Sequence, residues 1–146
     1  MVQSGSVDVS VTQDYENRGR LLNIAEKLAK IGYWRLDLAS NSVYWSDAVY
    51  QLHGMEPGLG SPDLEAAIDS YLPEDRPKVR AELEQCIRTK EPFEFSLRIR
   101  LPDGAIRNVR SYGVPELGND GEVFAIIGVF QDVTSHEDIE KQKRIN

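Results

Sequence analysis

Apolar and polar residues alternate through part of the second half of the chain. Between Phe93 and Leu101 every second residue is apolar, and the residues between them are charged or carry a hydroxyl. This period of two is typical of a β-strand with one buried face. Two more strands are predicted at about 105–114 and 123–132, because Pro-Asp-Gly and Gly-Asn-Asp-Gly turns separate the three segments. The pattern therefore predicts three long antiparallel strands in succession.

The last of these strands is apolar on both faces, since aromatic and aliphatic residues occupy most positions of 123–132. A strand of this kind is buried on both sides, so we expect another element to cover the outer face of the sheet. An amphipathic helix predicted at 17–31 suits this position, because Leu21, Ile24 and Leu28 fall on one face of it. The same helix face can instead pair with a second copy of the chain, which predicts a homodimer through this helix.

The first half of the chain predicts a short hairpin followed by three helices. Residues 33–38 and 43–45 have the pattern of strands, and a polar turn joins them. We expect the helices to begin at Ser46, at Ser61 and at Asp75, because these side chains can cap the free N–H groups of a first helical turn. Together with the three long strands, the pattern predicts an α+β fold, in which short helices cover one face of a five-stranded antiparallel sheet.

Four segments are predicted along the chain of 146 residues. They are a flexible lead-in at 1–16, the amphipathic helix at 17–31, one folded core at 32–133 and a C-terminal linker helix at 134–146. The last boundary lies where an apolar strand gives way to charged residues, and Thr134 can cap the helix that follows. A chain of this length has room for one domain with one hydrophobic core.

Composition and charge limit the classes of function. The chain has 17 basic and 24 acidic side chains, and its net charge of −7 argues against a surface for nucleic acid. No run approaches the roughly 18 apolar residues of a membrane span. The N-terminus also lacks the features of a signal peptide. We therefore expect a cytoplasmic location and no contact of this segment with a membrane.

The residues offer little support for a metal or catalytic site. Cys86 is the single cysteine, which excludes an internal disulfide, and its alignment with Leu83 predicts a buried structural thiol. Of the 2 histidines, His53 and His136, we expect His53 to be a helix-terminal or surface group. The sequence shows no set of metal ligands and no pair of nucleophile and base. We therefore predict no metal site and no catalysis by the domain itself.

A ligand cavity is a separate hypothesis. Its candidate lining residues are Trp34, Trp45, Tyr50, Phe95, Leu97 and Tyr112. These aromatic and aliphatic side chains can line a cavity for a small molecule, and they can equally fill the core completely. The sequence leaves both alternatives open.

The junction near residue 132 contains candidate residues for signal relay. If the Gly-Asn-Asp-Gly turn closes a simple hairpin, Asp132 lies opposite Arg107. An ion pair between them would join the exit of the domain to the middle strand. Pro115 can introduce a bulge that shifts the register, and Arg110 is then the alternative partner. We expect Asp132, Thr134 and Arg107 to transmit movement of the strand to the C-terminal helix.

The order of the predicted elements and several short motifs resemble a PAS domain of the PAS fold-3 type, followed by a PAC motif. The motifs are Gly32-Tyr-Trp-Arg-Leu-Asp37, Val43-Tyr-Trp-Ser46, Leu52-His-Gly54, Pro73-Glu-Asp-Arg76, Arg100-Leu-Pro-Asp-Gly104, the segment 113–121 and Gly128-Val-Phe-Gln-Asp-Val-Thr134. The resemblance covers about 25–134, and Asp132-Val-Thr134 is similar to the Asp-Ile-Thr signature of the family. The chain departs from the family at Asn108, where Trp is common, and at Leu72, where His is common.

The resemblance implies a non-catalytic sensory and relay domain of a multidomain bacterial signalling protein, such as a sensor histidine kinase, a diguanylate cyclase or a phosphodiesterase. The effector enzyme would then be a covalently linked domain, and a small-molecule ligand is a candidate signal. The chain lacks the Asn-Cys-Arg-Phe type motif of relatives that form a flavin adduct, and it has no His in 76–90, where haem-binding relatives carry their axial ligand. The cofactor is therefore left unknown. A ligand-free dimerisation or spacer module and a small α+β enzyme are the alternatives.

Overall fold

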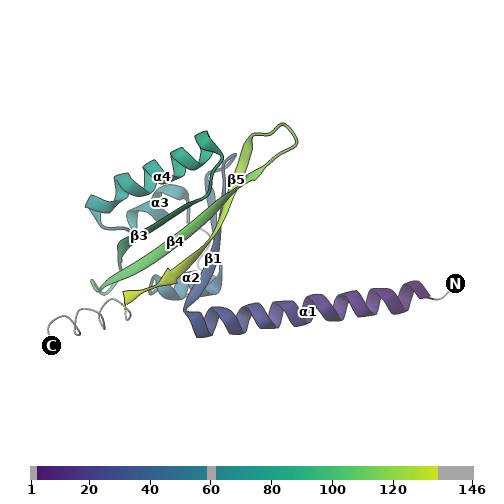
Figure 1. Ribbon diagram of the computed structural model, residues 1–146. Helices are drawn as coiled ribbons and strands as arrows, with labels where there is room; N and C mark the ends of the chain where they lie inside the picture. The colour runs from purple at the N-terminus through teal and green to yellow at the C-terminus, as the bar shows by residue number, and fades with distance from the viewer. Residues whose placement is uncertain (1–2, 59–61, 135–146) are drawn as a thin grey trace, which may run out of the picture.

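The computed structural model describes residues 3–58 and 62–134, and only the backbone at 3–12, 14 and 15. The strands are β1 (Ile31–Asp37), β2 (Ser42–Trp45), β3 (Phe93–Arg100), β4 (Ile106–Leu117) and β5 (Val123–Asp132). The helices are α1 (Gln3–Ala29), α2 (Asp47–Leu52), α3 (Leu64–Asp69), the 3-10 helix η1 (Pro73–Asp75) and α4 (Arg76–Thr89). The strands form a five-stranded antiparallel sheet in the order β2-β1-β5-β4-β3. Helices α2, α3 and α4 lie on one face of it (Figure 1), which confirms the expected fold class.

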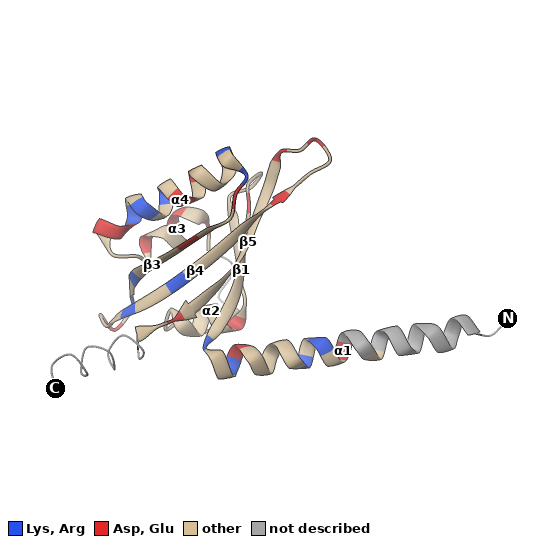
Figure 2. Ribbon diagram, in the orientation of Figure 1, with Lys and Arg blue, Asp and Glu red and all other residues tan. Residues whose placement is uncertain are grey.

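The alternating pattern of β3 decides which of its faces is buried. The apolar residues from Phe93 to Ile99 point into the core, and the residues between them lie at least partly in solvent. Helix α4 buries Val79, Leu83 and Cys86 against the same core, and it carries acidic and basic residues along its solvent side (Figure 2). Cys86 is the buried thiol that the sequence predicted, and burial raises its pKa.

Helix α1 differs from the expectation in length and in direction. It begins at Gln3, within the segment 1–16 for which the sequence predicted a flexible lead-in. Only Lys30, in the left-handed conformation with a φ of 54°, separates α1 from β1. This short connection starts the helix at one end of the sheet, and α1 projects away from the domain (Figure 1). The helix therefore does not cover the outer face of the sheet, and Leu28 is 81% exposed.

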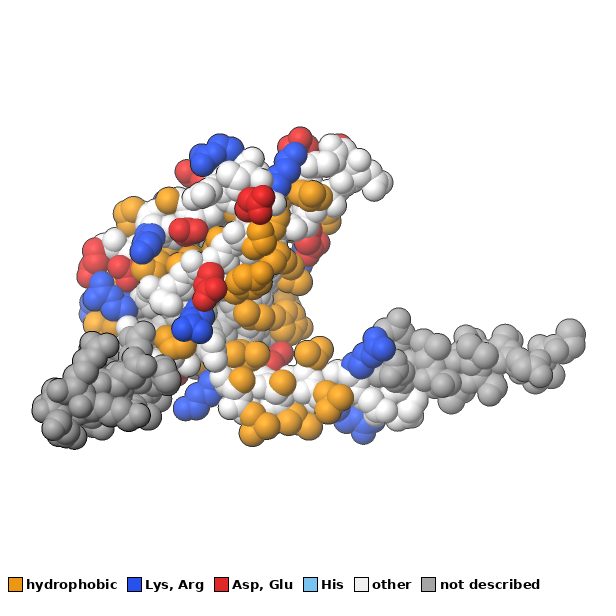
Figure 3. All heavy atoms as spheres, in the orientation of Figure 1, with side chains coloured by type: hydrophobic (Ala, Val, Ile, Leu, Met, Phe, Trp, Pro, Cys, Tyr) orange, Lys and Arg blue, Asp and Glu red, His pale blue; other side chains and the backbone are white. Residues whose placement is uncertain are grey.

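The projecting helix explains why its first residues show no apolar period. Apolar residues recur at helical spacing where one face of a helix is buried. Adding a turn to an existing helix costs little free energy even without such a face. The outer face of the sheet also keeps exposed apolar side chains, among them Tyr33, Tyr112 and Val129. Figure 3 shows hydrophobic side chains along this face and, separately, along α1. Within 3–58 and 62–134, no helix is both long enough and apolar enough to cross a membrane.

Two of the three expected capping side chains bind neighbouring strands instead. Ser46 precedes α2, but its hydroxyl accepts a hydrogen bond from a backbone N–H of β1 at 3.0 Å. Asp75 precedes α4, but its carboxylate accepts from the backbone N–H of Arg98 at 3.1 Å. Ser61 lies outside the described residues, and Asp63 caps α3 by accepting from a backbone N–H at 2.8 Å. Oxygen atoms near a helix start therefore bind whichever free N–H group the tertiary structure brings closest.

The connection between β4 and β5 shifts the strand register twice. The loop is one residue longer than in the simple hairpin assumed from the sequence. Phe124 then has no partner in β4, which adds a second shift in the same direction. Asp132 consequently pairs with Val109 and not with Arg107. Because a shift of two residues returns each side chain to its original face, Asp132 and Arg107 still share the inner face of the sheet.

Candidate functional site

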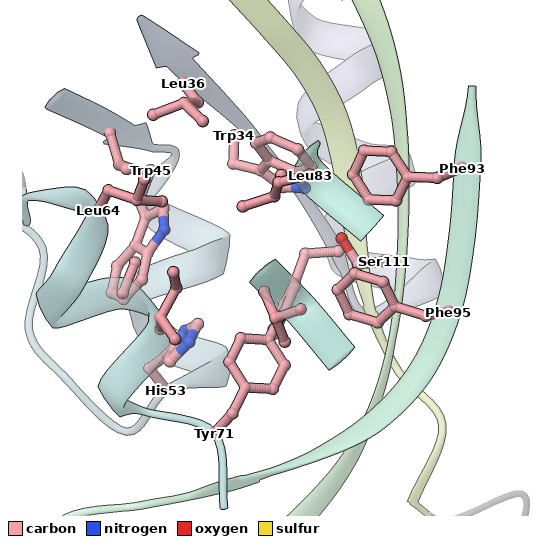
Figure 4. A pocket seen from close by; sticks show the side chains of 15 residues that line it. Trp34, Leu36, Trp45, His53, Leu64, Tyr71, Leu83, Phe93, Phe95 and Ser111 are labelled. Atoms are coloured by element: carbon pink, nitrogen blue, oxygen red, sulfur yellow. The ribbon is translucent and has the colours of Figure 1, made fainter. Parts of the chain in front are cut away.

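A cavity of about 70 Å³ lies between the inner face of the sheet and the covering helices. Side chains from all five strands, from α3 and α4 and from the end of α2 surround it, and Figure 4 shows ten of them with labels. Its aromatic residues other than histidine are Trp34, Trp45, Tyr71, Phe93, Phe95 and Phe130. The cavity is therefore enclosed mainly by flat apolar surfaces.

The structure divides the six candidate lining residues into three groups. Trp34, Trp45 and Phe95 line the cavity. Tyr50 and Leu97 are buried in the same core but do not border the cavity. The sequence could group these residues as apolar and inward-facing, but it could not show where the packing leaves space.

Tyr112 forms the third group, because it lies on the outer face of the sheet. Its side chain is 42% exposed, and its neighbour Ser111 lines the cavity instead. Successive residues of a strand point to opposite faces, so only one of the two can reach the interior. The assignment of Tyr112 to the cavity is therefore wrong.

His53 lies at the end of α2, as the sequence predicted, but it also lines the cavity. It is 4% exposed and is not a surface group. Its ring is stacked between Trp45, at 4.1 Å between ring centroids, and Phe130, at 5.0 Å. Its Nδ1 lies 2.9 Å from the carbonyl oxygen of Val49. The spacing of four residues between Val49 and His53 is the sequence signal that could have placed both on one buried face.

The cavity is uncharged near neutral pH. Burial lowers the pKa of His53 from 6.5 to about 4, the charge of Arg107 adds to this, and the hydrogen bond to Val49 opposes it. Burial also raises the pKa of Tyr71. Among the described lining residues there is no Asp, Glu, Lys or Arg. A charged molecule in this space would therefore lack a counter-charge.

Arg107 connects the cavity region with the strand that leaves the domain. Its Nε lies 3.4 Å from Oδ2 of Asp132 at the end of β5. Its Nη1 donates a hydrogen bond to the carbonyl oxygen of Leu52, the last residue of α2. Arg110, the alternative partner of Asp132, instead lies 3.6 Å from a carboxylate oxygen of Glu94. The structure therefore brings Asp132 and Arg107 together, although the predicted register is wrong.

Thr134 is fastened to the neighbouring strand. Its hydroxyl accepts a hydrogen bond from Asn108 N at 2.6 Å, and its own N–H donates to Oδ1 of Asp132 at 2.9 Å. The N–H of Asp132 donates to the carbonyl oxygen of Lys30 at 3.2 Å. The exit from the domain is thus tied both to β4 and to the end of α1. Apart from Thr134, the linker helix expected at 134–146 lies outside the described residues.

Comparison with known proteins supports this architecture. A protein-family model described as the PAS fold matches residues 42–130. The probable diguanylate cyclase DgcE of Escherichia coli (strain K12) is 27% identical to the chain over 113 residues, which are 77% of this chain and 10% of that protein. The chain therefore spans about 10% of the length of this curated relative.

Solved structures have the same fold. A sensory box histidine kinase/response regulator from Burkholderia thailandensis E264 is 25% identical, with a TM-score of 0.69 over 85% of this chain and 92% of that one. The N-terminal domain of a diguanylate cyclase with PAS/PAC sensor from Marinobacter aquaeolei is 20% identical, with a TM-score of 0.67 over 73% of this chain and 98% of that one. The family model matches more than half of the chain, and its span contains β3, β4 and most of β5. The chain belongs to the PAS fold family.

Proposed function

We propose that this chain is a non-catalytic sensory and relay domain within a multidomain bacterial signalling protein. The similarity to a probable diguanylate cyclase and to a sensory histidine kinase supports a kinase or a cyclase as the covalently linked effector, and a phosphodiesterase stays an expectation from the family resemblance. In this proposal the core extends over 32–133, and the helix at 134–146 carries the signal out. The PAC motif near the end of the core stays a prediction.

The contacts of Arg107 carry this proposal. One end of its guanidinium binds the carbonyl of Leu52, which directly precedes the cavity residue His53. Its Nε pairs with Asp132, whose carboxylate also accepts from the N–H of Thr134. A displacement of the end of α2 therefore changes the position of the guanidinium, and with it the hydrogen bonds that hold the exit segment.

A ligand can drive such a change only if it binds one arrangement more tightly than the other. The cavity and the junction share the inner face of β5, because Phe130 lines the cavity and Asp132 follows two residues later. The proposed input and the proposed output therefore lie next to each other on one strand. No long chain of contacts is needed between them.

The relay can be tested with Asp132→Asn in the complete signalling protein. We expect basal or stimulated output to change, because the neutral amide weakens the ion pair while keeping the size of the side chain. Glu94→Gln is the matched control, since it alters an ion pair with Arg110 on the outer face. Unchanged basal and stimulated output in Asp132→Asn would refute the relay.

Homodimerisation through α1 is a second part of the proposal. Leu21, Ile24 and Leu28 are each more than half exposed on α1, although their spacing is that of a buried helix face. The outer face of the sheet is apolar and exposed as well (Figure 3). Helix α1 projects away from its own sheet, so a second copy of the chain can supply a matching apolar surface.

Sedimentation of the chain with and without residues 1–29 tests the dimer. We expect a dimer for the complete chain and a monomer for the truncated one. The double substitution Leu21→Gln and Leu28→Gln keeps the helix and removes its apolar face, so it should also give a monomer. Monomers in every case would contradict the proposal.

A ligand-free spacer is the alternative favoured by the small cavity volume of about 70 Å³. In that case the same fold would only hold two effector chains together. A spacer predicts that substitutions at Asp132 leave the output unchanged while loss of α1 abolishes it. A small enzyme is less well supported, because the described cavity residues include only His53 and Tyr71 as titratable groups.

The cellular location and the absence of membrane or nucleic-acid partners are proposed from the sequence. We propose that this segment acts in the cytoplasm and contacts no membrane. The net charge of −7 supports the absence of a nucleic-acid partner. A fluorescent fusion of the complete protein, viewed in living cells, tests the location.

A further inference from the structure

We infer that the cavity binds a small uncharged aromatic molecule that carries one O–H or N–H donor, and that Nε2 of His53 accepts the hydrogen bond from this donor. The inference names the ligand class of the proposed sensory site, and its regulatory meaning rests on that proposed function. Three observations lead to it: the size of the cavity, its lack of charge and the free nitrogen of His53.

The size of the cavity limits the ligand to about one ring. A buried water needs roughly 10–15 Å³ of cavity volume that is open to the centre of a water molecule. The observed volume of about 70 Å³ therefore has room for a molecule of a few non-hydrogen atoms. Aromatic side chains supply much of the wall, and flat rings pack against one another stacked or edge to face. A single aromatic ring matches both the volume and the walls.

The lining excludes a charged ligand. The described lining residues contain no Asp, Glu, Lys or Arg, and His53 is neutral near pH 7 because its pKa is lowered. An ionised group in this space would lose its hydration without gaining an opposite charge. A neutral molecule loses much less hydration free energy when it enters the cavity.

His53 supplies a fixed acceptor. Its Nδ1 lies 2.9 Å from the carbonyl oxygen of Val49, so Nδ1 carries the proton in the neutral ring. Nε2 then has a lone pair, and within 3–58 and 62–134 the hydrogen bond found for this ring is the one at Nδ1. Trp45 and Phe130 hold the ring on its two sides, at 4.1 and 5.0 Å. The lone pair is therefore held in a constant direction.

Figure 4 shows the His53 ring beside that of Trp45, facing the same space as Tyr71. Tyr71 and Ser111 also border the cavity, and each hydroxyl can donate as well as accept. Nε2 of neutral His53 can only accept. It is the lining atom that most requires a donor from the ligand.

Binding of phenol and toluene to the 146-residue chain tests the inference, because the two molecules have nearly the same shape and only phenol has a donor. We expect phenol to bind to the wild-type chain in calorimetry at pH 7. In His53→Phe, which keeps an aromatic ring in the stack, we expect phenol affinity to fall about tenfold. Toluene affinity should change less than about twofold, and benzoate should not bind to either protein.

A second measurement uses only the wild-type chain, so it tests the inference even if His53→Phe does not fold. The ¹⁵N resonance of His53 Nε2 should move when phenol saturates the cavity and should move much less with toluene. The inference fails if phenol does not bind, if both molecules lose affinity equally in the variant, or if the Nε2 resonance does not respond. If phenol binds as expected but leaves the output of the complete protein unchanged, the ligand site stands and the proposed sensory function fails.

Discussion

The two faces of the sheet are built from the same strands but have different surroundings. On the inner face, Phe130 is 3% exposed beneath the helices. On the outer face, its neighbour Val129 is 41% exposed although it is also apolar. Apolar residues along a strand therefore show how much surface requires a cover, but not whether the chain's own helices provide it. The difference assigns the stability of the single chain to the packing of the inner face.

Two phenylalanines on β5 give the largest expected contrast between the faces. Phe130→Ala should lower the free energy of unfolding by about 3–5 kcal/mol, because it removes a buried ring and leaves a cavity. Phe124 is 47% exposed, so Phe124→Ala should cost less than about 1 kcal/mol. Urea denaturation of dilute samples measures both values. Equal losses would show that the outer face contributes to the core of the single chain.

The titration of His53 tests how completely water is excluded from the inner face of the sheet. Its pKa is 6.5 when unfolded and about 4 when folded, so between these values the unfolded chain binds a proton that the folded chain does not. Stability should therefore fall as the pH drops from 6.5 to 4, by up to roughly 3 kcal/mol from this group.

His53→Phe is the control for this titration, because it removes the titrating group and keeps an aromatic ring. The difference in unfolding free energy between wild type and variant, followed from pH 7 to pH 4, isolates the contribution of His53 from that of the carboxylates. A constant difference over this range would mean that His53 reaches water.

The two ion pairs on opposite faces of the sheet should give the smallest difference in the loss of unfolding free energy. The side chains of Arg107 and Asp132 are 29% and 11% exposed, whereas those of Arg110 and Glu94 are 50% and 57% exposed. Asp132→Asn should therefore cost about 1–3 kcal/mol, and Glu94→Gln less than about 1 kcal/mol. Urea denaturation measures both, and the loss from Asp132→Asn should respond less to added salt. Similar costs would show that water reaches both pairs equally.

Part of the candidate site could be predicted from the sequence. Asp132 and Arg107 were expected to meet, and the structure brings them to 3.4 Å in spite of the wrong register. The reason is that the longer loop and the unpaired Phe124 shift the strand by two residues in total, which preserves the face. A shift of one residue would have separated the pair.

Other parts of the site could not be predicted in this way. The sequence predicted a helix-terminal or surface position for His53 because it follows a short helix, and the burial of its ring between Trp45 and Phe130 depends on distant residues. Tyr112 is aromatic like the cavity residues, but the strand places it on the outer face. Residue type alone does not separate an interior aromatic from an exposed one.

Most of the elements and the family could be inferred from the sequence. The alternation of β3 and the helical spacing in α4 result from the burial of one face, so they can be read from residues close together in the chain. The packing of the folded chain sets the direction of α1, the partners of Ser46 and Asp75, and the place of His53 in the cavity. These features depend on which distant residues come within a few ångströms of each other, and no local pattern records those distances.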